Sequence, residues 1–202
     1  MIRRFFLAAL SGLMALGCLL IATPSHAADV ARINSYLNGI ETLRGSFVQI
    51  SPDGTVTEGL FYIRRPGRMR FEYEEPNPTL VIADGFWAAV LDRRLATVDR
   101  YPLSETPLYL LLKENVDLSG EGAIQSVESA DGQLKVTAVD PGNAGQGSIT
   151  MVFDAQPLAL KQWIVTDPQG LTTTIALREI QQNVRIAPEL FVIPEKDILD
   201  QN

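Results

Sequence analysis

Residues 59–74 have the sequence GLFYIRRPGRMRFEYE, and the pattern in their second half decides the fold. Met69, Phe71 and Tyr73 alternate there with arginine and glutamate residues. Successive side chains of a β-strand point to opposite faces of a sheet, so this alternation predicts a strand with one apolar face and one charged face. We expect the apolar face to lie inside the protein.

Turn-forming residues recur along the chain between segments that are rich in β-branched and aromatic residues. The turn signals lie at residues 52–54, 84–85, 131–132, 140–142 and 167–170. They predict about nine to eleven strands between Gly45 and Ile193, paired as an antiparallel meander. Because so many strands do not fit one flat sheet, we expect a mainly β protein with few helices and a curved sheet or partial barrel.

Three segments have the features of helices, and the third is a short one near residues 188–190. Residues 29–43 carry apolar residues on one helical face, with Asp29 as the candidate N-cap. The residues on that face are Val30, Ile33, Leu37, Ile40 and Leu43. Residues 106–114 begin with Thr106 as a cap and Pro107 at the first helical position. Apolar residues nearly encircle this second helix, which should therefore lie in the concavity of the sheet.

The N-terminal segment has the features of a secretory signal peptide. Two arginines precede an apolar run over residues 5–22, and Ala27 ends a small-x-small cleavage pattern. We therefore expect a cleaved signal peptide at residues 1–27 and a single exported domain at residues 28–202. The alternative is lipid attachment at Cys18, but the apolar core of the segment continues beyond that cysteine.

The only cysteine and the only histidine of the chain, Cys18 and His26, both lie in this segment. The expected mature chain therefore lacks thiols and imidazoles, which excludes disulfides, Cys/His metal sites, and Ser-His-Asp or Cys-His catalysis. We expect no metal and no cofactor. Loss of Arg3 and Arg4 would change the formal net charge from −7 to −9, which argues against binding to nucleic acid or to an anionic membrane by charge.

Carboxylates are the remaining acid–base groups, and Glu72 and Glu74 cluster near the end of one strand. Glycoside hydrolysis needs two carboxylates that face a cleft, so a secreted carboxylate-dependent hydrolase is one hypothesis. These glutamates share the parity of Arg68 and Arg70, however, which predicts a solvated, charged outer face. We therefore expect no enzymatic activity.

Arg65 follows four successive apolar residues, 60–63, at the end of an expected strand. It either lies at the strand end with its side chain in water or turns into the mouth of the concavity. In the second case its five N–H donors are able to hold backbone carbonyls of a covering helix or loop. The residues alone do not decide between these two interpretations.

Four motifs, in order, resemble the outer-membrane lipoprotein carrier proteins, the LolA family. They are Gly45-Ser46-Phe47-Val48-Gln49, then Gly59-x-Phe61-x-Ile63-x-Arg65-Pro66-Gly67-x-Met69-Arg70-Phe71-x-Tyr73, then Pro78-x-Leu80-Val81-Ile82-Ala83-Asp84-Gly85, then Thr106-Pro107-Leu108. The resemblance extends from the first helix to about Leu112 and continues more weakly afterwards. The order and spacing of the motifs, together with the signal peptide, make it specific.

The resemblance implies a periplasmic chaperone with a half-open antiparallel β-barrel, closed by helices over an apolar cavity for acyl chains. Its cargo would be triacylated lipoproteins, its partners an inner-membrane lipoprotein-releasing ABC transporter complex and an outer-membrane lipoprotein receptor, and its state a monomer. By the match, Arg65 corresponds to an arginine that latches the lid. The expected cavity residues are Phe47, Met69, Phe71, Tyr73, Leu80, Ile82, Trp87 and Leu91, and the expected lid-helix residues are Pro107, Leu108, Leu111 and Leu112.

Two alternatives share this fold class. One is an outer-membrane-anchored lipoprotein receptor, acylated at Cys18. The other is a periplasmic binding module for a different amphiphile. The stretch between Asp84 and Thr106 departs most from the family pattern, so the assignment of its lining residues is the least constrained.

Overall fold

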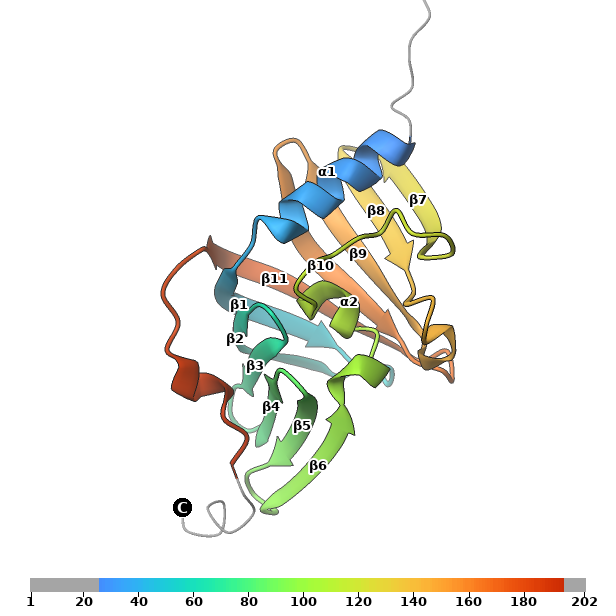
Figure 1. The fold of residues 1–202 in the computed structure, drawn as a ribbon. Coiled ribbons are helices and arrows are strands. Elements are labelled where there is room, and N and C mark those ends of the chain that lie inside the picture. Colours follow the sequence, from blue (N-terminus) through green and yellow to red (C-terminus); the bar gives the residue numbers. More distant parts are fainter. Residues whose placement is uncertain (1–25, 195–202) are drawn as a thin grey trace, which may run out of the picture.

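The computed structural model describes residues 26–194, so Cys18 and most of the expected signal peptide lie outside the described residues. It contains eleven strands, in agreement with the expected number, and two α-helices (Figure 1). The helices are α1 (His26–Asn38) and α2 (Tyr109–Leu112). The strands are β1 (Thr42–Ile50), β2 (Val56–Arg64), β3 (Arg68–Tyr73), β4 (Thr79–Asp84), β5 (Trp87–Asp92), β6 (Thr97–Pro102), β7 (Ile124–Ala130), β8 (Gln133–Ala138), β9 (Ser148–Ala155), β10 (Leu158–Thr166) and β11 (Thr172–Gln182). Within this part of the chain, neither helix has the length and apolar character that a bilayer-spanning segment needs.

All eleven strands form one antiparallel sheet in the order β6-β5-β4-β3-β2-β1-β11-β10-β9-β8-β7. It consists of two meanders, β1 to β6 and β7 to β11, which are joined by the pairing of β1 with β11. Each of the five expected turns connects two neighbouring strands, as predicted. The sheet is curled, but in residues 26–194 its edge strands β6 and β7 do not pair. The sheet therefore forms a half-open barrel and not a closed one.

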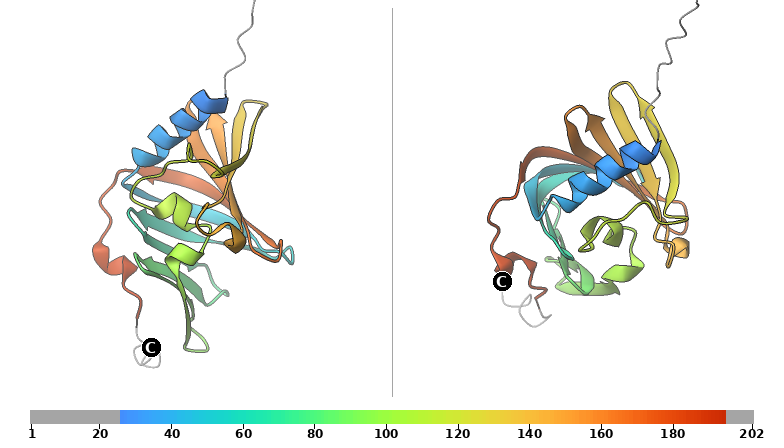
Figure 2. Two further views of the ribbon diagram at one scale, coloured as in Figure 1. Left: turned by 45° about the vertical axis from the view of Figure 1, so that its right-hand side comes forward. Right: turned by 45° about the horizontal axis from the view of Figure 1, so that its top comes forward.

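The connection from β6 to β7 crosses the concave side of the sheet and includes α2 (Figure 2). α2 is a single turn, although helix was expected over residues 106–114. Thr106 does not cap it, because its hydroxyl donates to the carbonyl of Leu103 at 2.8 Å. The helix stops because Lys113 has an extended backbone (φ −63°, ψ 155°), and the carbonyl of Lys113 accepts hydrogen bonds from Arg65. Leu110, Leu111 and Leu112 are buried in the concavity, as the encircling apolar pattern predicted.

Helix α1 lies across the β7–β11 half of the concave face (Figure 1). Its residues Val30, Ile33 and Leu37 are buried in the core, as the spacing predicted. Its expected boundaries were wrong at both ends. The helix already includes His26, so Asp29 is not the N-cap but a buried residue that pairs with Arg32 at 3.1 Å.

The C-terminal boundary differs because the chain changes direction at Gly39, whose N–H donates to the carbonyl of Ser35 at 3.0 Å. Ile40 and Leu43 are buried in the same core, but Ile40 follows the helix and Leu43 belongs to β1. Apolar residues at helical spacing thus continued past the end of the helix into the first strand.

Candidate functional site

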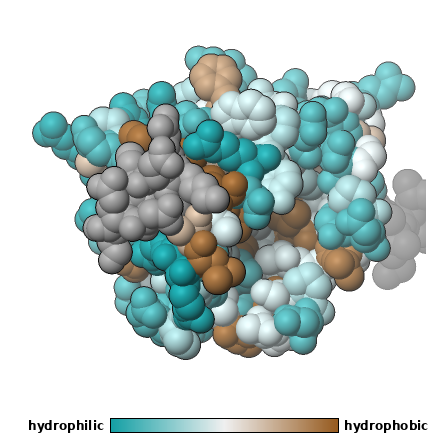
Figure 3. All heavy atoms as spheres, turned by 90° about the horizontal axis from the view of Figure 1, so that it is seen from below, coloured by the Kyte–Doolittle hydropathy of each residue, from teal (hydrophilic) through white to brown (hydrophobic). Residues whose placement is uncertain are grey.

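The concave face holds a cavity of about 360 Å³ whose wall is mainly apolar. This volume lies within the range of ordinary small-molecule sites. The lining residues are Gln49, Met69, Phe71, Tyr73, Val81, Val90, Leu108, Trp163, Val165, Thr173 and Ile175. Figure 3 shows the molecule from below, with apolar side chains visible in a recess between polar ones.

Cross-strand register explains how one wall of the cavity is built. Phe71 pairs with Val81, and Val81 pairs with Val90, so these three side chains form a row across β3, β4 and β5. The ring of Phe71 contacts the ring of Trp163 from the other half of the sheet, with the centroids 6.0 Å apart. Residues from both meanders therefore meet at one apolar floor.

The expected residues of β1 and β3 lie on the concave face. Met69, Phe71 and Tyr73 line the cavity. Phe47 lies behind them, almost fully buried, with its ring 4.7 Å from Phe71 and 5.1 Å from Tyr73. The alternation in residues 59–74 therefore placed this part of the wall.

Four expected cavity residues, Leu80, Ile82, Trp87 and Leu91, lie on the opposite, convex face. Leu80, Ile82 and Leu91 are buried there in a second apolar cluster, and Trp87 has the same parity as Leu91. The prediction was wrong because residues 80–83 and 87–91 are apolar at every position, so these two stretches carry no parity signal. Val81 and Val90 line the cavity instead.

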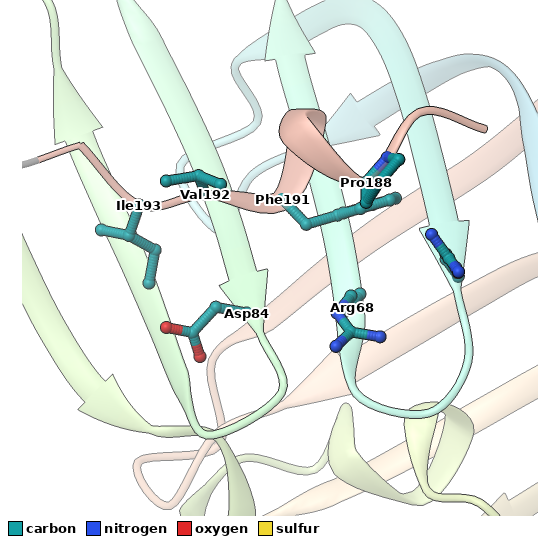
Figure 4. A pocket seen from close by; sticks show the side chains of 7 residues that line it. Arg68, Asp84, Pro188, Phe191, Val192 and Ile193 are labelled. Atoms are coloured by element: carbon teal, nitrogen blue, oxygen red, sulfur yellow. The ribbon is translucent and has the colours of Figure 1, made fainter.

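The C-terminal segment, residues 183–194, covers the convex cluster and so allows these side chains to be buried. Ile193 packs against it, and Figure 4 shows this segment next to Arg68 of β3 and Asp84 of β4. A pocket of about 480 Å³ remains between the segment and the strands. The residues lining this pocket are Arg64, Arg68, Asp84, Pro188, Phe191, Val192 and Ile193.

This segment also changes the environment of the charged face of β3. Arg70 donates from Nε to Glu72 Oε1 at 2.7 Å and from Nη1 to the carbonyl of Leu190 at 3.1 Å. The side chains of Arg70 and Glu72 are only 16% and 30% exposed. This face is therefore only partly solvated, whereas a solvated face was expected. Glu72 is thus held in an ion pair on the convex face, outside the cavity.

Arg65 lies at the junction of the two covering segments. Its guanidinium donates from Nη1 to the carbonyls of Leu37 and Ile40 at the end of α1. It also donates from Nη2 to the carbonyls of Lys113 and Glu114, at 2.6 and 3.0 Å, just after α2. Carbonyls at helix C-termini lack donors within the helix and carry partial negative charge, so a guanidinium satisfies them well. Burial lowers the pKa of Arg65 from its ordinary value.

Two asparagines of α1 hold the segment that follows α2. Asn38 pairs with the backbone of Val116 in both directions, accepting from its N–H at 2.9 Å and donating to its carbonyl at 2.8 Å. One turn earlier, Asn34 accepts from the N–H of Leu118 at 3.0 Å. We did not predict these contacts, and their only sequence signal is two asparagines four residues apart on the polar face of a helix.

The β2–β3 turn makes a further contact with α2. The Gly67 N–H donates to the carbonyl of Leu112 at 2.8 Å. Gly67 has a φ of +73°, and a Cβ there would lie 2.7 Å from the Cα of Gly85. Of the expected lid residues, Leu108 lines the cavity, Leu111 and Leu112 are buried in the core, and Pro107 is half-buried.

One end of the cavity is polar. The Tyr73 hydroxyl donates to Gln49 Oε1 at 2.6 Å, and Gln49 Nε2 donates to Ser51 Oγ at 3.0 Å. Burial raises the pKa of Tyr73 to about 12, although the hydrogen bond to Gln49 opposes this shift. The Tyr73 hydroxyl therefore stays protonated at neutral pH.

Comparison with known families matches residues 38–194 to the outer membrane lipoprotein carrier protein LolA. An outer-membrane lipoprotein carrier protein of Chromobacterium violaceum is 30% identical, over 88% of this chain and 89% of that protein. A protein with the same name from Pseudomonas aeruginosa is 28% identical, over 100% of this chain and 99% of its own length. A solved LolA superfamily structure from Nitrosomonas europaea aligns at a TM-score of 0.43 and 10% identity, over 81% of this chain and 97% of that one. The family match over residues 38–194 shows that this chain belongs to the LolA family of outer membrane lipoprotein carrier proteins.

Proposed function

We propose that this protein is a periplasmic carrier that shields the acyl chains of triacylated lipoproteins in the concave cavity. It receives them from an inner-membrane ABC transporter complex and delivers them, as a monomer, to an outer-membrane receptor. The relatives named as lipoprotein carriers support a role in carrying lipoproteins. The observation that carries the proposal is the apolar cavity between Phe71, Trp163 and Leu108, beneath a cover held by hydrogen bonds.

The physical need for such a cavity is large. Each CH₂ group exposed to water costs about 0.8 kcal/mol, so one C16 chain costs on the order of 12 kcal/mol in the aqueous periplasm. A carrier has to bury this surface reversibly. It requires an apolar cavity and a cover that opens, and it requires no nucleophile or metal.

In this proposal, Arg65 makes the opening of the cover reversible. Its hydrogen bonds to carbonyls on both covering segments stabilise the closed, empty state by about 1 to 3 kcal/mol for each charged bond. An incoming acyl chain displaces the cover, and burial of the chain compensates for the broken contacts. Because closing again favours release of the chain, the same side chain promotes delivery to the receptor.

The test compares two neighbouring arginines. In Arg65→Leu, we expect the protein to fold and to bind lipoprotein but to release it poorly to the receptor, because the closed state is no longer favoured. Arg64→Leu is the matched control, since Arg64 lines the pockets outside the cavity, and it should transfer normally. Normal transfer by Arg65→Leu would contradict the latch.

Native mass spectrometry of the protein purified from the periplasm tests the carrier role itself. We expect triacylated lipoprotein to be bound, and more of it on Arg65→Leu than on wild type. If neither protein carries lipid or lipoprotein, the proposed function is wrong. The same spectra separate carrier from anchored receptor, because the carrier should begin at an unmodified Ala28 and the receptor at an acylated Cys18.

A further inference from the structure

The polar residues of the cavity wall are all at one end of it. Gln49 is next to the last residue of β1, Tyr73 is the last residue of β3, and Thr173 is the second residue of β11. The strand register places these ends side by side, since Gln49 pairs with Ile175 and Ile50 pairs with Thr174. The rest of the wall is apolar, so the cavity has one polar end.

This polar end is far from the Arg65 contacts. Thr42 pairs with Arg64 at one end of the β1–β2 hairpin, and Gln49 pairs with Thr57 near the other. At about 3.3 Å per residue, the two ends are roughly 20 Å apart. An acyl chain lying along the strands would therefore have its head at one end and its tail toward Met69, near the lid contacts.

The groups at the polar end are hydrogen-bond donors without charge. Gln49 uses one N–H on Ser51, which leaves its second amide N–H, and Thr173 contributes a hydroxyl to the wall. Tyr73 uses its own proton on Gln49 and fixes the orientation of that amide. None of the lining residues is charged, so the wall favours a neutral acceptor over a carboxylate or phosphate.

We propose that Gln49 and Thr173 form a polar subsite that hydrogen-bonds the ester or amide carbonyl oxygen at the head of a bound acyl chain. This inference rests on the proposed function of carrying acyl chains. The carbonyl takes the place of water at these donors, so they do not lose partners when the cavity fills. The subsite thereby orients the chain, with the head at the hairpin end and the tail in the apolar end.

Thr57 provides a matched control. It lies opposite Gln49 on β2 and has a buried hydroxyl without a hydrogen-bond partner among the described residues, but it does not line the cavity. Thr57→Val and Thr173→Val remove the same hydroxyl group from the two strands that flank β1. Only the second removes a proposed ligand contact.

The experiment measures binding of two probes by isothermal titration calorimetry. Dioctanoylglycerol has ester carbonyls, and its dioctyl ether analogue has chains of nearly the same length without them. We expect wild type and Thr57→Val to prefer the ester about tenfold, as one or two hydrogen bonds allow. We expect Thr173→Val and Gln49→Leu to lose most of that preference while their affinity for the ether stays unchanged.

Two results would overturn the subsite. One is equal binding of ester and ether by wild type, and the other is an ester preference that survives in both Thr173→Val and Gln49→Leu. Either result leaves the carrier role intact, because the apolar cavity still binds both probes. If wild type binds neither probe and carries no lipoprotein, the carrier proposal fails and the subsite fails with it.

Discussion

The two halves of the concave face are filled in different ways. Under α1, side chains such as Ile33, Leu37 and Phe153 are completely or almost completely buried, and the ring of Phe153 packs edge-on against Tyr36 at 5.7 Å. Beside α2, the wall that includes Phe71 borders an open cavity. α1 has 13 residues and α2 has 4, so α1 covers a longer part of the concave face than α2 does. The cavity thus lies beside the shorter of the two covering helices.

The largest expected effect lies in the filled half. Phe153→Ala should lower the free energy of unfolding by about 3 to 5 kcal/mol, because it leaves a void beneath α1 that the surrounding strands fill only in part. Urea denaturation followed by circular dichroism measures the loss. A loss below about 1 kcal/mol would show that this half is as loosely packed as the other.

Two substitutions of valine by phenylalanine, one in each half, sharpen the comparison. Val136→Phe overfills the α1 side, where Val136 is fully buried, and should cost about 1 to 3 kcal/mol of stability. Val90→Phe adds the same atoms beside the cavity, where Val90 is 40% exposed, and should change stability by about 0.5 kcal/mol or less. Val90→Phe should instead weaken binding of dioctanoylglycerol, measured by calorimetry, because the ring occupies ligand space. Equal destabilisation by the two variants would contradict the distinction between the halves.

The smallest expected effect on stability lies in the segment after α2, where it contacts α1. The Asp117 carboxylate accepts from the Ser119 N–H at 2.8 Å, and this bond lowers the pKa of Asp117 from its ordinary value of 3.8. A lowered pKa in the folded state means that the stabilisation is present above pH 3.8 and is lost as the pH falls further. Asp117→Asn should therefore have a lower melting temperature than wild type at neutral pH. In acid the melting temperatures of the two proteins should converge. A difference that stays constant between pH 7 and pH 2 would contradict this assignment.

Local patterns predicted the parts of the site that depend on local geometry. The alternation around Phe71 fixed one wall, and turn residues such as 167–170 marked the hairpins. The encircling apolar residues of α2 correctly indicated a buried position. Its length was overestimated, because Arg65, far away in sequence, binds the carbonyl of Lys113 where the helix would continue.

The errors arose where two distant segments meet. Ile82 faces outward because the C-terminal segment provides a second buried surface for it, and no local pattern of β4 records that contact. The contact between Asn38 and Val116 similarly joins residues that are 78 positions apart. Residues that are buried on both faces of a strand have no alternation, so their direction depends on tertiary contacts alone.

The unpaired edges β6 and β7 have a mechanical consequence. A closed barrel has a circumference set by its number of strands and their stagger, so it cannot widen without breaking ladder hydrogen bonds. In residues 26–194 this sheet has no such closure, and its two meanders are joined through the β1–β11 pairing. The outer edges of the meanders can therefore move apart while every existing strand pair stays intact, provided that the hydrogen bonds of Arg65 and Asn38 to the segment after α2 are broken.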